Sequence, residues 1–287
     1  MSASLPPVFL LAGPTASGKS AHALQWAAQT GGVIVNADSM QLYHDVPILT
    51  ARPSAADEAA APHRLYGHLS GQDLWSTGDW VRAVKPYIDD ALSGGQPLCL
   101  VGGTGLYFLS LIRGLSEIPD IDDAVRQKAR QAYADMGEAA FRALLRPHDP
   151  AAEARIAAND RQRLTRALEV FWQTGRSLSD WQKTNRPFVP QGRYQLTLLS
   201  PDRDTLYRRC DQRFTQMMAQ GALEEVESLM AKGLRPDWPI MRVLGLSELC
   251  AYLRDEMTLE AAIALAQQKT RNYAKRQTTF FGNQFKG

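Results

Sequence analysis

"VFLLAGPTASGKS", residues 8–20, joins an apolar run to a glycine-rich turn that ends in Lys19 and Ser20. The run Val8–Ala12 has the length and composition of a buried strand. From Gly13 the turn fits the spacing G-x-x-x-x-G-K-[ST], in which backbone N–H groups and a helix N-terminus bind phosphate. A chance match in a surface turn is the alternative, but the strand pattern before it and the helical pattern after it disfavour that. The stretch therefore predicts a strand, a phosphate loop and a helix.

Two further apolar runs also end in small or polar residues, at residues 33–35 before "NADS" and at residues 98–101 before "GGTGLY". Helical patterns lie between the runs, at residues 20–29 and 78–92. This alternation predicts a parallel sheet with helical crossovers. The expected fold class is α/β, a P-loop NTPase-like parallel sheet flanked by helices.

The pattern changes after "GLSEIPDIDD", and from about residue 122 to residue 184 only helical periodicity is present. We predict an all-helical insertion over residues 119–193, within a core whose first part covers residues 1–118. Residues 194–287 complete the core. They contain a strand pattern at 194–200 and two long helical segments near 204–232 and 258–280.

The composition of the 287 residues is that of an ordinary globular protein with a net charge of +2. Cys99, Cys210 and Cys250 show neither metal-ligand spacing nor a disulfide framework, which favours a reducing cytoplasm. The first apolar run lacks a preceding basic segment, so it predicts a strand rather than a signal peptide. No run is long enough to span a bilayer, and nothing in the sequence demands more than a monomer.

Parallel sheets bind ligands at the carboxyl ends of their strands. The phosphate loop, Asp38 and residues 102–105 are therefore expected to meet at one site. A carboxylate at this place holds Mg²⁺ or accepts a proton from a nucleophile, and the alternative for Asp38 is a helix N-cap. The strand "PLCLVGG" ends in glycines rather than in a Mg²⁺-binding aspartate, which favours group transfer over hydrolysis.

Arg213 lies at the edge of a helical apolar stripe formed by Leu206, Cys210, Phe214 and Met217. An arginine in this position requires an anion. The sequence leaves two candidates equally open: a structural carboxylate and a substrate phosphate.

Two basic clusters stand out from the near-neutral average. They are Arg161, Arg163 and Arg166 in "DRQRLTR", and Lys269, Arg271, Lys275 and Arg276 in "KTRNYAKRQ". Such clusters form either a solvated helix face or a surface for a nucleic-acid backbone.

Several stretches, in order and over nearly the whole chain, resemble one family, the bacterial tRNA dimethylallyltransferases. They are "GPTASGKS", "NADSMQLY", "APHRL", "LVGGTGLY", "NDRQRLTRALEVF", "DQRFTQMM" and "TRNYAKRQTT". The family transfers a dimethylallyl group from dimethylallyl diphosphate to the exocyclic amine of the adenine 3′ of the anticodon, releasing diphosphate.

The resemblance implies a role for each candidate residue. Asp38 is the expected general base, Arg213 the expected diphosphate ligand, and Thr104 is expected beside the reacting groups. The expected diphosphate site consists of Gly13, Pro14, Thr15, Ala16, Ser17, Gly18, Lys19 and Ser20, with Mg²⁺ near Ser20. The expected contacts with the tRNA anticodon stem-loop are Asp38, Ser39, Met40, Gln41, Arg126, Gln162, Arg163, Leu164, Thr165, Arg166, Arg242, Gly245, Thr270, Arg271, Lys275, Arg276 and Gln277. The helical insertion is expected to act as a tRNA clamp.

The sequence departs from the family pattern in three places. Leu246 and Ser247 stand where the family has an aromatic residue and an arginine, Phe280 and Gly282 replace a tryptophan and an arginine, and "VPILTARP" replaces "DIGTAKP". Two other functions remain as alternatives: a P-loop kinase of a nucleoside or small metabolite, and a non-catalytic, nucleotide-gated RNA-binding module. A metabolite kinase has no need of the two basic clusters.

Overall fold

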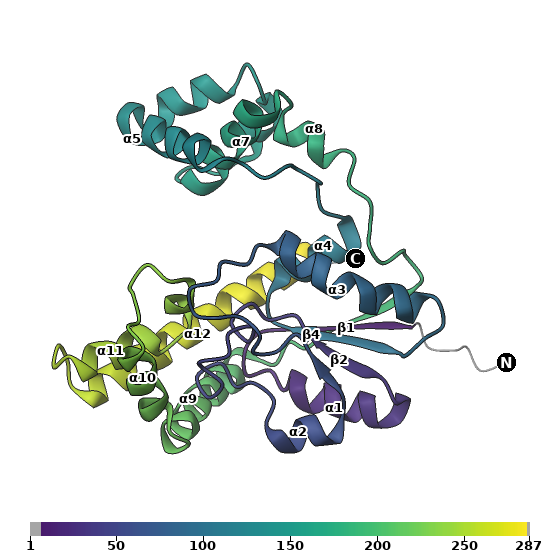
Figure 1. The fold of residues 1–287 in the computed structure, drawn as a ribbon, viewed down its shortest axis with the longest axis vertical. Coiled ribbons are helices and arrows are strands. Elements are labelled where there is room, and N and C mark those ends of the chain that lie inside the picture. Colours follow the sequence, from purple (N-terminus) through teal and green to yellow (C-terminus); the bar gives the residue numbers. More distant parts are fainter. Residues whose placement is uncertain (1–6, 286–287) are drawn as a thin grey trace. The chain divides into compact units, whose positions relative to one another are not determined.

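The computed structural model describes residues 7–285, and the chain divides into two compact units. A helical unit, Arg113–Pro187, is inserted into an α/β unit formed by the residues before and after it (Figure 1). The predicted insertion, 119–193, lies further along the chain at both ends. The reason is that the backbone N–H groups of Phe188 and Val189 already donate to the carbonyl oxygen of Leu111 in the α/β unit, at 2.8 and 3.1 Å.

Five parallel strands form the sheet of the α/β unit, in the order β3-β2-β4-β1-β5. The strands are β1 (Val8–Ala12), β2 (Val33–Asn36), β3 (His63–Arg64), β4 (Leu98–Gly102) and β5 (Tyr194–Leu198). Leu10 of β1, an interior strand, is fully buried and pairs in register with Leu100 and Leu196 on its two sides. The predicted parallel sheet is therefore confirmed. β3 was not predicted because two polar residues at a sheet edge leave no apolar run.

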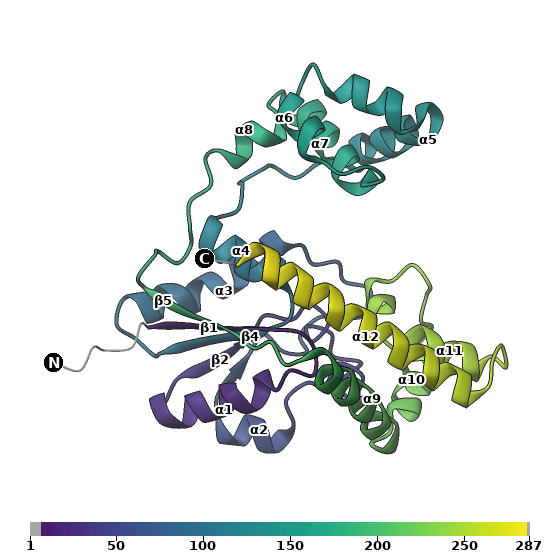
Figure 2. The same ribbon diagram turned by 180° about the vertical axis from the view of Figure 1, so that it is seen from behind.

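Helices cover both faces of the sheet (Figures 1 and 2). One face carries α1 (Lys19–Thr30) and α2 (Ala55–Ala60), and the other carries α3 (Thr77–Leu92) and α4 (Gly105–Arg113). Trp80 of α3 is fully buried, and its indole N–H donates to the carbonyl oxygen of Asn36 at the end of β2, at 2.8 Å. This contact fixes α3 close to the end of a strand where ligands are expected.

The C-terminal part of the chain is helical and lies beyond the carboxyl ends of the strands (Figure 2). Its elements are α9 (Arg203–Ala219), α10 (Ala222–Ala231), the short 3₁₀ helix η1 (Pro239–Arg242), α11 (Leu246–Leu253) and α12 (Leu259–Gln284). α12 packs against both α9 and α11. The predicted helical segment near 204–232 consists of two helices, because Gly221 adopts a left-handed conformation with φ 100° and begins a new helix.

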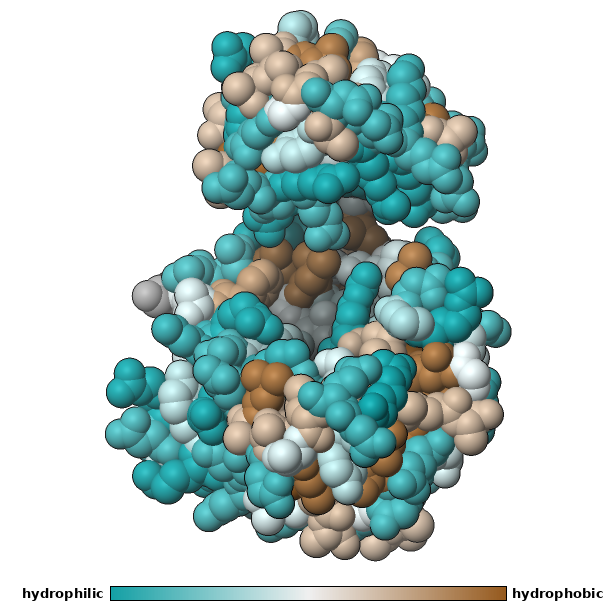
Figure 3. Space-filling view, turned by 90° about the vertical axis from the view of Figure 1, so that its left-hand side faces the viewer, coloured by the Kyte–Doolittle hydropathy of each residue, from teal (hydrophilic) through white to brown (hydrophobic). Residues whose placement is uncertain are grey.

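The helical unit contains α5 (Asp123–Leu145), α6 (Pro150–Arg155), α7 (Arg161–Thr174) and α8 (Leu178–Gln182). α5 packs on α7 around a small core that includes Phe141, Leu145 and Leu168. The face of this unit shown in Figure 3 carries mainly hydrophilic side chains, with small apolar patches among them.

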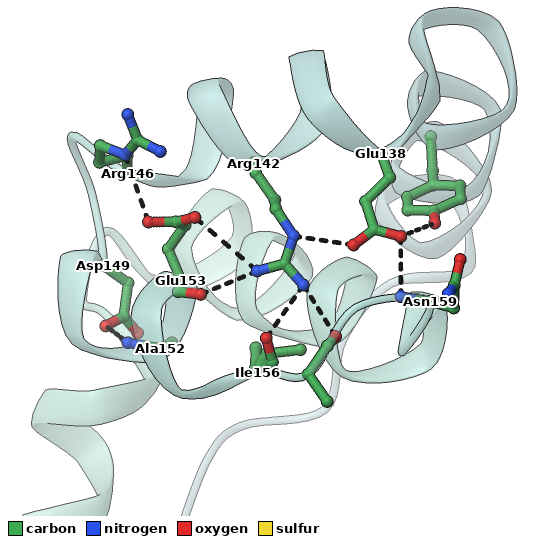
Figure 4. Close-up of polar contacts among 10 residues, drawn as sticks. Glu138, Arg142, Arg146, Asp149, Ala152, Glu153, Ile156 and Asn159 are labelled. Carbon is green, nitrogen blue, oxygen red and sulfur yellow. Dashed lines mark hydrogen bonds and ion pairs between the residues drawn. The ribbon is translucent and has the colours of Figure 1, made fainter.

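Arg142 lies at the centre of a polar network in the helical unit (Figure 4). Its guanidinium donates to a carboxylate oxygen of Glu138 at 2.8 Å and to the carbonyl oxygen of Ile156 at 2.9 Å. Glu138 also accepts a hydrogen bond from the backbone N–H of Asn159 at 2.9 Å. The network therefore holds the turn that leads into α7, where the first basic cluster begins.

Within the part of the chain that the structure describes, no helix combines the length and the hydropathy that crossing a membrane requires.

Candidate active site

The phosphate loop connects β1 to α1, as the sequence predicted. Gly18 has φ 93° and immediately precedes α1. A Cβ at Gly13 would lie 2.6 Å from the carbonyl oxygen of Leu199, so this position tolerates no side chain. Ala16 also has a positive φ, 61°, which is unusual for a residue other than glycine. The loop is thus a tight turn whose shape depends on its surroundings.

Lys19 points back over the phosphate loop, and its ammonium donates to the carbonyl oxygen of Pro14 at 2.6 Å. Burial lowers the pKa of Lys19 to about 8, the carboxylate of Asp38 acts in the opposite direction, and the guanidinium of Arg213 lowers the pKa further. Within residues 7–285 no carboxylate forms an ion pair with this ammonium. A bound anion would therefore stabilise the charged form of Lys19.

Asp38 follows β2, and its backbone is held by the buried side chain of Asn36. The Asn36 amide accepts from the N–H of Asp38 at 2.7 Å and donates to its carbonyl oxygen at 2.9 Å. One carboxylate oxygen of Asp38 accepts from the N–H of Met40 at 3.0 Å, a turn that resembles the N-cap considered from the sequence. No helix follows this turn. The second oxygen accepts no hydrogen bond from any described residue, so it is available to a ligand.

Thr104 supports the neighbouring backbone. Its hydroxyl accepts from the N–H of Ser39 at 2.9 Å and donates to the Ser39 hydroxyl at 3.2 Å. Glycines are required beside it, since a Cβ at Gly102 would lie 2.0 Å from the carbonyl oxygen of Ala37. The sequence "GGTG" therefore allows β4 to end directly against the segment that carries Asp38.

Arg213 of α9 donates from its guanidinium to the hydroxyl of Thr15 in the phosphate loop. No carboxylate forms an ion pair with it within residues 7–285. Burial lowers the pKa of Arg213, while Cys210 and Asp38 act in the opposite direction. Of the two candidates left open by the sequence, this arrangement favours a substrate anion over a structural carboxylate.

Some of these groups line one cavity of about 370 Å³, although Lys19 and Thr104 are not among its lining residues. Its polar lining includes Thr15, Asp38 and Arg213, and its apolar lining includes Phe214 and Met217. The remaining lining residues are Ser39, Met40, Leu49, Thr50, Cys210, Arg242, Val243, Leu244, Thr270, Tyr273 and Arg276. An anionic group and an apolar group can therefore lie side by side in this cavity.

Five of the predicted tRNA contacts are buried in this structure. They are Leu164, Thr165, Gly245, Thr270 and Gln277. Leu164 belongs to the core of the helical unit, and the hydroxyls of Thr165 and Thr270 bond to their own helices. Gly245 lacks room for a Cβ, which would lie 2.6 Å from the ring of Phe214.

Gln41 is also engaged within the protein, because its amide donates to the carbonyl oxygens of Thr50 and Ala51 at 2.9 and 2.8 Å. In this structure it therefore holds the loop around Thr50, which lines the cavity.

The other predicted tRNA contacts retain a free or partly free surface. Gln162, Arg163, Arg242, Lys275 and Arg276 are exposed. Arg126, Arg166 and Arg271 are half-buried and form ion pairs with Asp123, Glu169 and Asp211 respectively. Along α12 a second hollow of about 540 Å³ is lined by Lys275 and Arg276 together with Asn272, Thr279, Phe280, Asn283 and Gln284.

The structure shows what the residues contact at two of the three departures from the family pattern. Phe280 packs on the turn after β4, since a Cβ at Gly105 would lie 2.3 Å from its ring. Leu246 is fully buried at the start of α11, whereas Ser247 is exposed and its hydroxyl donates to Glu248 at 2.9 Å. The cavity is therefore formed without the aromatic residue and the arginine of the family pattern.

Ser20 is the expected metal ligand, and it is exposed in the first turn of α1 beside the phosphate loop. No group of three or more His, Cys, Asp or Glu side chains suited to a metal ion occurs in residues 7–285. Ser20 offers one hydroxyl oxygen, so an ion held there would need further ligands from other groups. Cys99, Cys210 and Cys250 are buried free thiols.

A family model described as "IPP transferase" matches residues 41–284, and one described as "Isopentenyl transferase" matches residues 6–70. Among curated relatives, the tRNA dimethylallyltransferase of Phenylobacterium zucineum is 51% identical over 282 residues, which are 98% of this chain and 91% of that protein. The tRNA dimethylallyltransferase of a Caulobacter species is 48% identical, over 96% of this chain and 90% of its own.

Solved structures agree with this result. A tRNA isopentenylpyrophosphate transferase from Bacillus halodurans matches with a TM-score of 0.67 and 32% identity, over 96% of this chain and 86% of its own. A eukaryotic dimethylallyltransferase, crystallised in a study of its action on tRNA, matches with a TM-score of 0.82 and 25% identity. The match covers 96% of this chain and 69% of that protein's chain. The chain therefore belongs to the IPP transferase family, and it is a prenyltransferase rather than a metabolite kinase or a non-catalytic RNA-binding module.

Proposed function

We propose that this enzyme transfers the dimethylallyl group of dimethylallyl diphosphate to the exocyclic amine of the adenine 3′ of the anticodon in tRNA, releasing diphosphate. One observation carries the proposal. Asp38, Arg213 and Thr15 line the same cavity as Arg276, which belongs to a basic helix. The cavity thus offers a proton acceptor, a diphosphate site and a neighbouring RNA-binding surface.

The phosphate loop and Arg213 act on the leaving group. As the bond between C1 of the donor and the diphosphate oxygen breaks, its electron pair passes to the diphosphate. Lys19, Arg213 and the hydroxyl of Thr15 lie around the loop before the donor binds. They stabilise the growing charge without having to reorganise during the reaction. The binding energy is therefore largest in the transition state.

Asp38 acts on the acceptor. The adenine amine is a poor nucleophile because its lone pair is delocalised into the ring. As the new C–N bond forms, the amine loses a proton to the free carboxylate oxygen of Asp38, and positive charge does not accumulate on nitrogen. Asn36 and Met40 keep the carboxylate in place through their hydrogen bonds.

Mg²⁺ is part of the proposal. Ser20 and the oxygens of the bound diphosphate would hold the ion, which would neutralise part of the diphosphate charge.

The adenine has to leave the stack of the anticodon loop to reach the cavity, which costs a few kcal/mol. Backbone contacts from exposed basic side chains offset this cost. Lys275 and Arg276 on α12 and Arg163 on α7 are the exposed candidates, and α7 belongs to the helical unit that we assign as the clamp. One chain supplies every group that the reaction needs, so the proposal is a monomeric enzyme acting in the cytoplasm.

Labelled dimethylallyl diphosphate or labelled ATP, incubated with the enzyme and bulk tRNA, tests the reaction. Label should enter RNA from the first and not from the second; the opposite pattern would exclude prenyl transfer. Asp38→Asn should then slow prenylation by about 10²–10⁴-fold while tRNA binding is kept, because only proton transfer is lost. Asp237→Asn, at an exposed ion pair, is the matched control and should leave the rate unchanged.

A further inference from the structure

Gln277 of α12 connects two parts of the candidate site. Its side chain is 6% exposed. The amide oxygen accepts from the N–H of Thr15 in the phosphate loop at 2.8 Å, and the amide nitrogen donates to the carbonyl oxygen of Gly103 after β4, also at 2.8 Å. Both polar atoms of the amide are thus used, and each is bonded to a segment more than 170 residues away. In this structure the side chain is therefore engaged within the protein.

The phosphate loop depends on contacts of this kind. Ala16 has φ 61°, and a residue other than glycine in this conformation is held by its surroundings at a cost of about 1–2 kcal/mol. Ala16 packs against Leu206, Cys210 and Ala274, which belong to α9 and α12. The loop therefore rests on these two helices, and Gln277 provides its hydrogen bond to α12.

The same helix carries the surface expected to meet RNA. Lys275 and Arg276 directly precede Gln277 and are exposed. Arg276 and Tyr273 also line the cavity. A helix moves as a rigid element, so an RNA that fixes α12 through Lys275 and Arg276 also fixes the amide of Gln277.

We propose that Gln277 is a positioning residue that couples RNA binding on α12 to diphosphate binding in the phosphate loop. The inference rests on the proposed function, since it assumes an RNA acceptor and a diphosphate donor. Such coupling is reciprocal: RNA tightens diphosphate binding by the same factor by which diphosphate tightens RNA binding. One hydrogen bond held in place by RNA corresponds to a factor of about ten.

Calorimetry with inorganic diphosphate and Mg²⁺, in the presence and absence of an anticodon stem-loop RNA, measures the coupling without turnover. In the wild-type enzyme the RNA should lower the Kd of diphosphate by about tenfold. In Gln277→Ala the ratio of the two Kd values should fall to about one. Gln267→Ala is the matched control, because Gln267 lies on the same helix and donates to the carbonyl oxygen of Asp211 at 3.2 Å, away from the loop. This variant should keep the wild-type ratio.

The variant Gln277→Glu distinguishes a role of Gln277 in positioning the phosphate loop from a role in folding. A protonated glutamic acid offers one donor and one acceptor, as glutamine does, whereas the carboxylate has no donor for the carbonyl oxygen of Gly103. The coupling should therefore be absent at pH 8 and return as the pH is lowered, while circular dichroism shows the same folded state at both pH values. The control for the direct effect of pH is the wild-type ratio over the same range.

A wild-type ratio of one, or an unchanged ratio in Gln277→Ala, would overturn the inference. Failure of the enzyme to prenylate tRNA would instead overturn the proposed function, because the binding measurement does not depend on turnover.

Discussion

The lowered pKa of Lys19 should make donor binding depend on pH between pH 7 and pH 9. Burial lowers this pKa to about 8, and diphosphate binds to the ammonium form. Burial raises the pKa values of the Cys210 thiol and the Tyr273 hydroxyl, which opposes loss of their protons as the pH rises. The perturbation to apply is a rise in pH across this interval.

The direction and the size of the pH effect on donor binding follow from the protonation equilibrium of Lys19. With a pKa of about 8, Lys19 is about 90% charged at pH 7, half charged at pH 8 and about 10% charged at pH 9. Above the pKa, a proton must be taken up each time diphosphate binds. The kcat/KM for dimethylallyl diphosphate should therefore fall about fourfold from pH 7 to pH 8.5 and about tenfold to pH 9.

Initial rates at saturating tRNA, with the donor concentration varied at each pH, measure this dependence. Lys19→Arg is the control, because a guanidinium stays charged throughout the interval. Its kcat/KM should be lower than that of the wild type at pH 7 and should not change up to pH 9. A flat wild-type profile, or the same fall in Lys19→Arg, would refute the assignment of the titration to Lys19.

Two further predictions concern the leaving group and the RNA surface. Arg213→Lys keeps the charge but loses the planar donor that contacts Thr15, so it should raise the KM for the donor by about tenfold or more without lowering the melting temperature; a fall in the melting temperature alone, measured by calorimetry, would make Arg213 a structural residue. Arg163→Ala should weaken tRNA binding and lower the slope of log K against log salt by about 0.7 to 0.9, because the side chain is exposed. Leu164→Ala should instead cost about 2–5 kcal/mol of stability, measured by urea unfolding, because its side chain is fully buried.

The sheet was predictable because its strands carry their own signals. Val8–Ala12, residues 33–35 and residues 98–101 are apolar runs that end in turn residues, and the structure has strands at all of them. The edge strand His63–Arg64 carries no such signal, since two polar residues do not form a pattern. Gly221 breaks a helix that periodicity alone would continue, because a left-handed glycine and an isolated helical glycine look alike in sequence.

The contacts of α12 were harder to predict than the helix itself. The buried side of this helix includes Thr270 and Gln277 among alanines, so hydropathy does not distinguish it from the exposed side that carries Lys275. A buried polar residue is identified by its partners, and those of Gln277 lie in segments far away in the sequence. Asn36 was missed for a different reason. It directly precedes "ADS" in the quoted motif, but the double hydrogen bond to the backbone of Asp38 becomes visible only in three dimensions.

The charges of the site explain why the phosphate loop is better suited to a leaving group than to a structural ion pair. Arg213 lowers the pKa of Lys19, and the carboxylate of Asp38 raises the pKa values of both cations. One carboxylate cannot neutralise two cations, so the apo site carries excess positive charge that a diphosphate can offset. Since the carboxylate of Asp38 has one oxygen free, it can accept a proton from the amine as negative charge moves to the diphosphate. The same arrangement therefore favours the departure of diphosphate and the loss of a proton from the amine, the two charge movements that prenyl transfer to an amine requires.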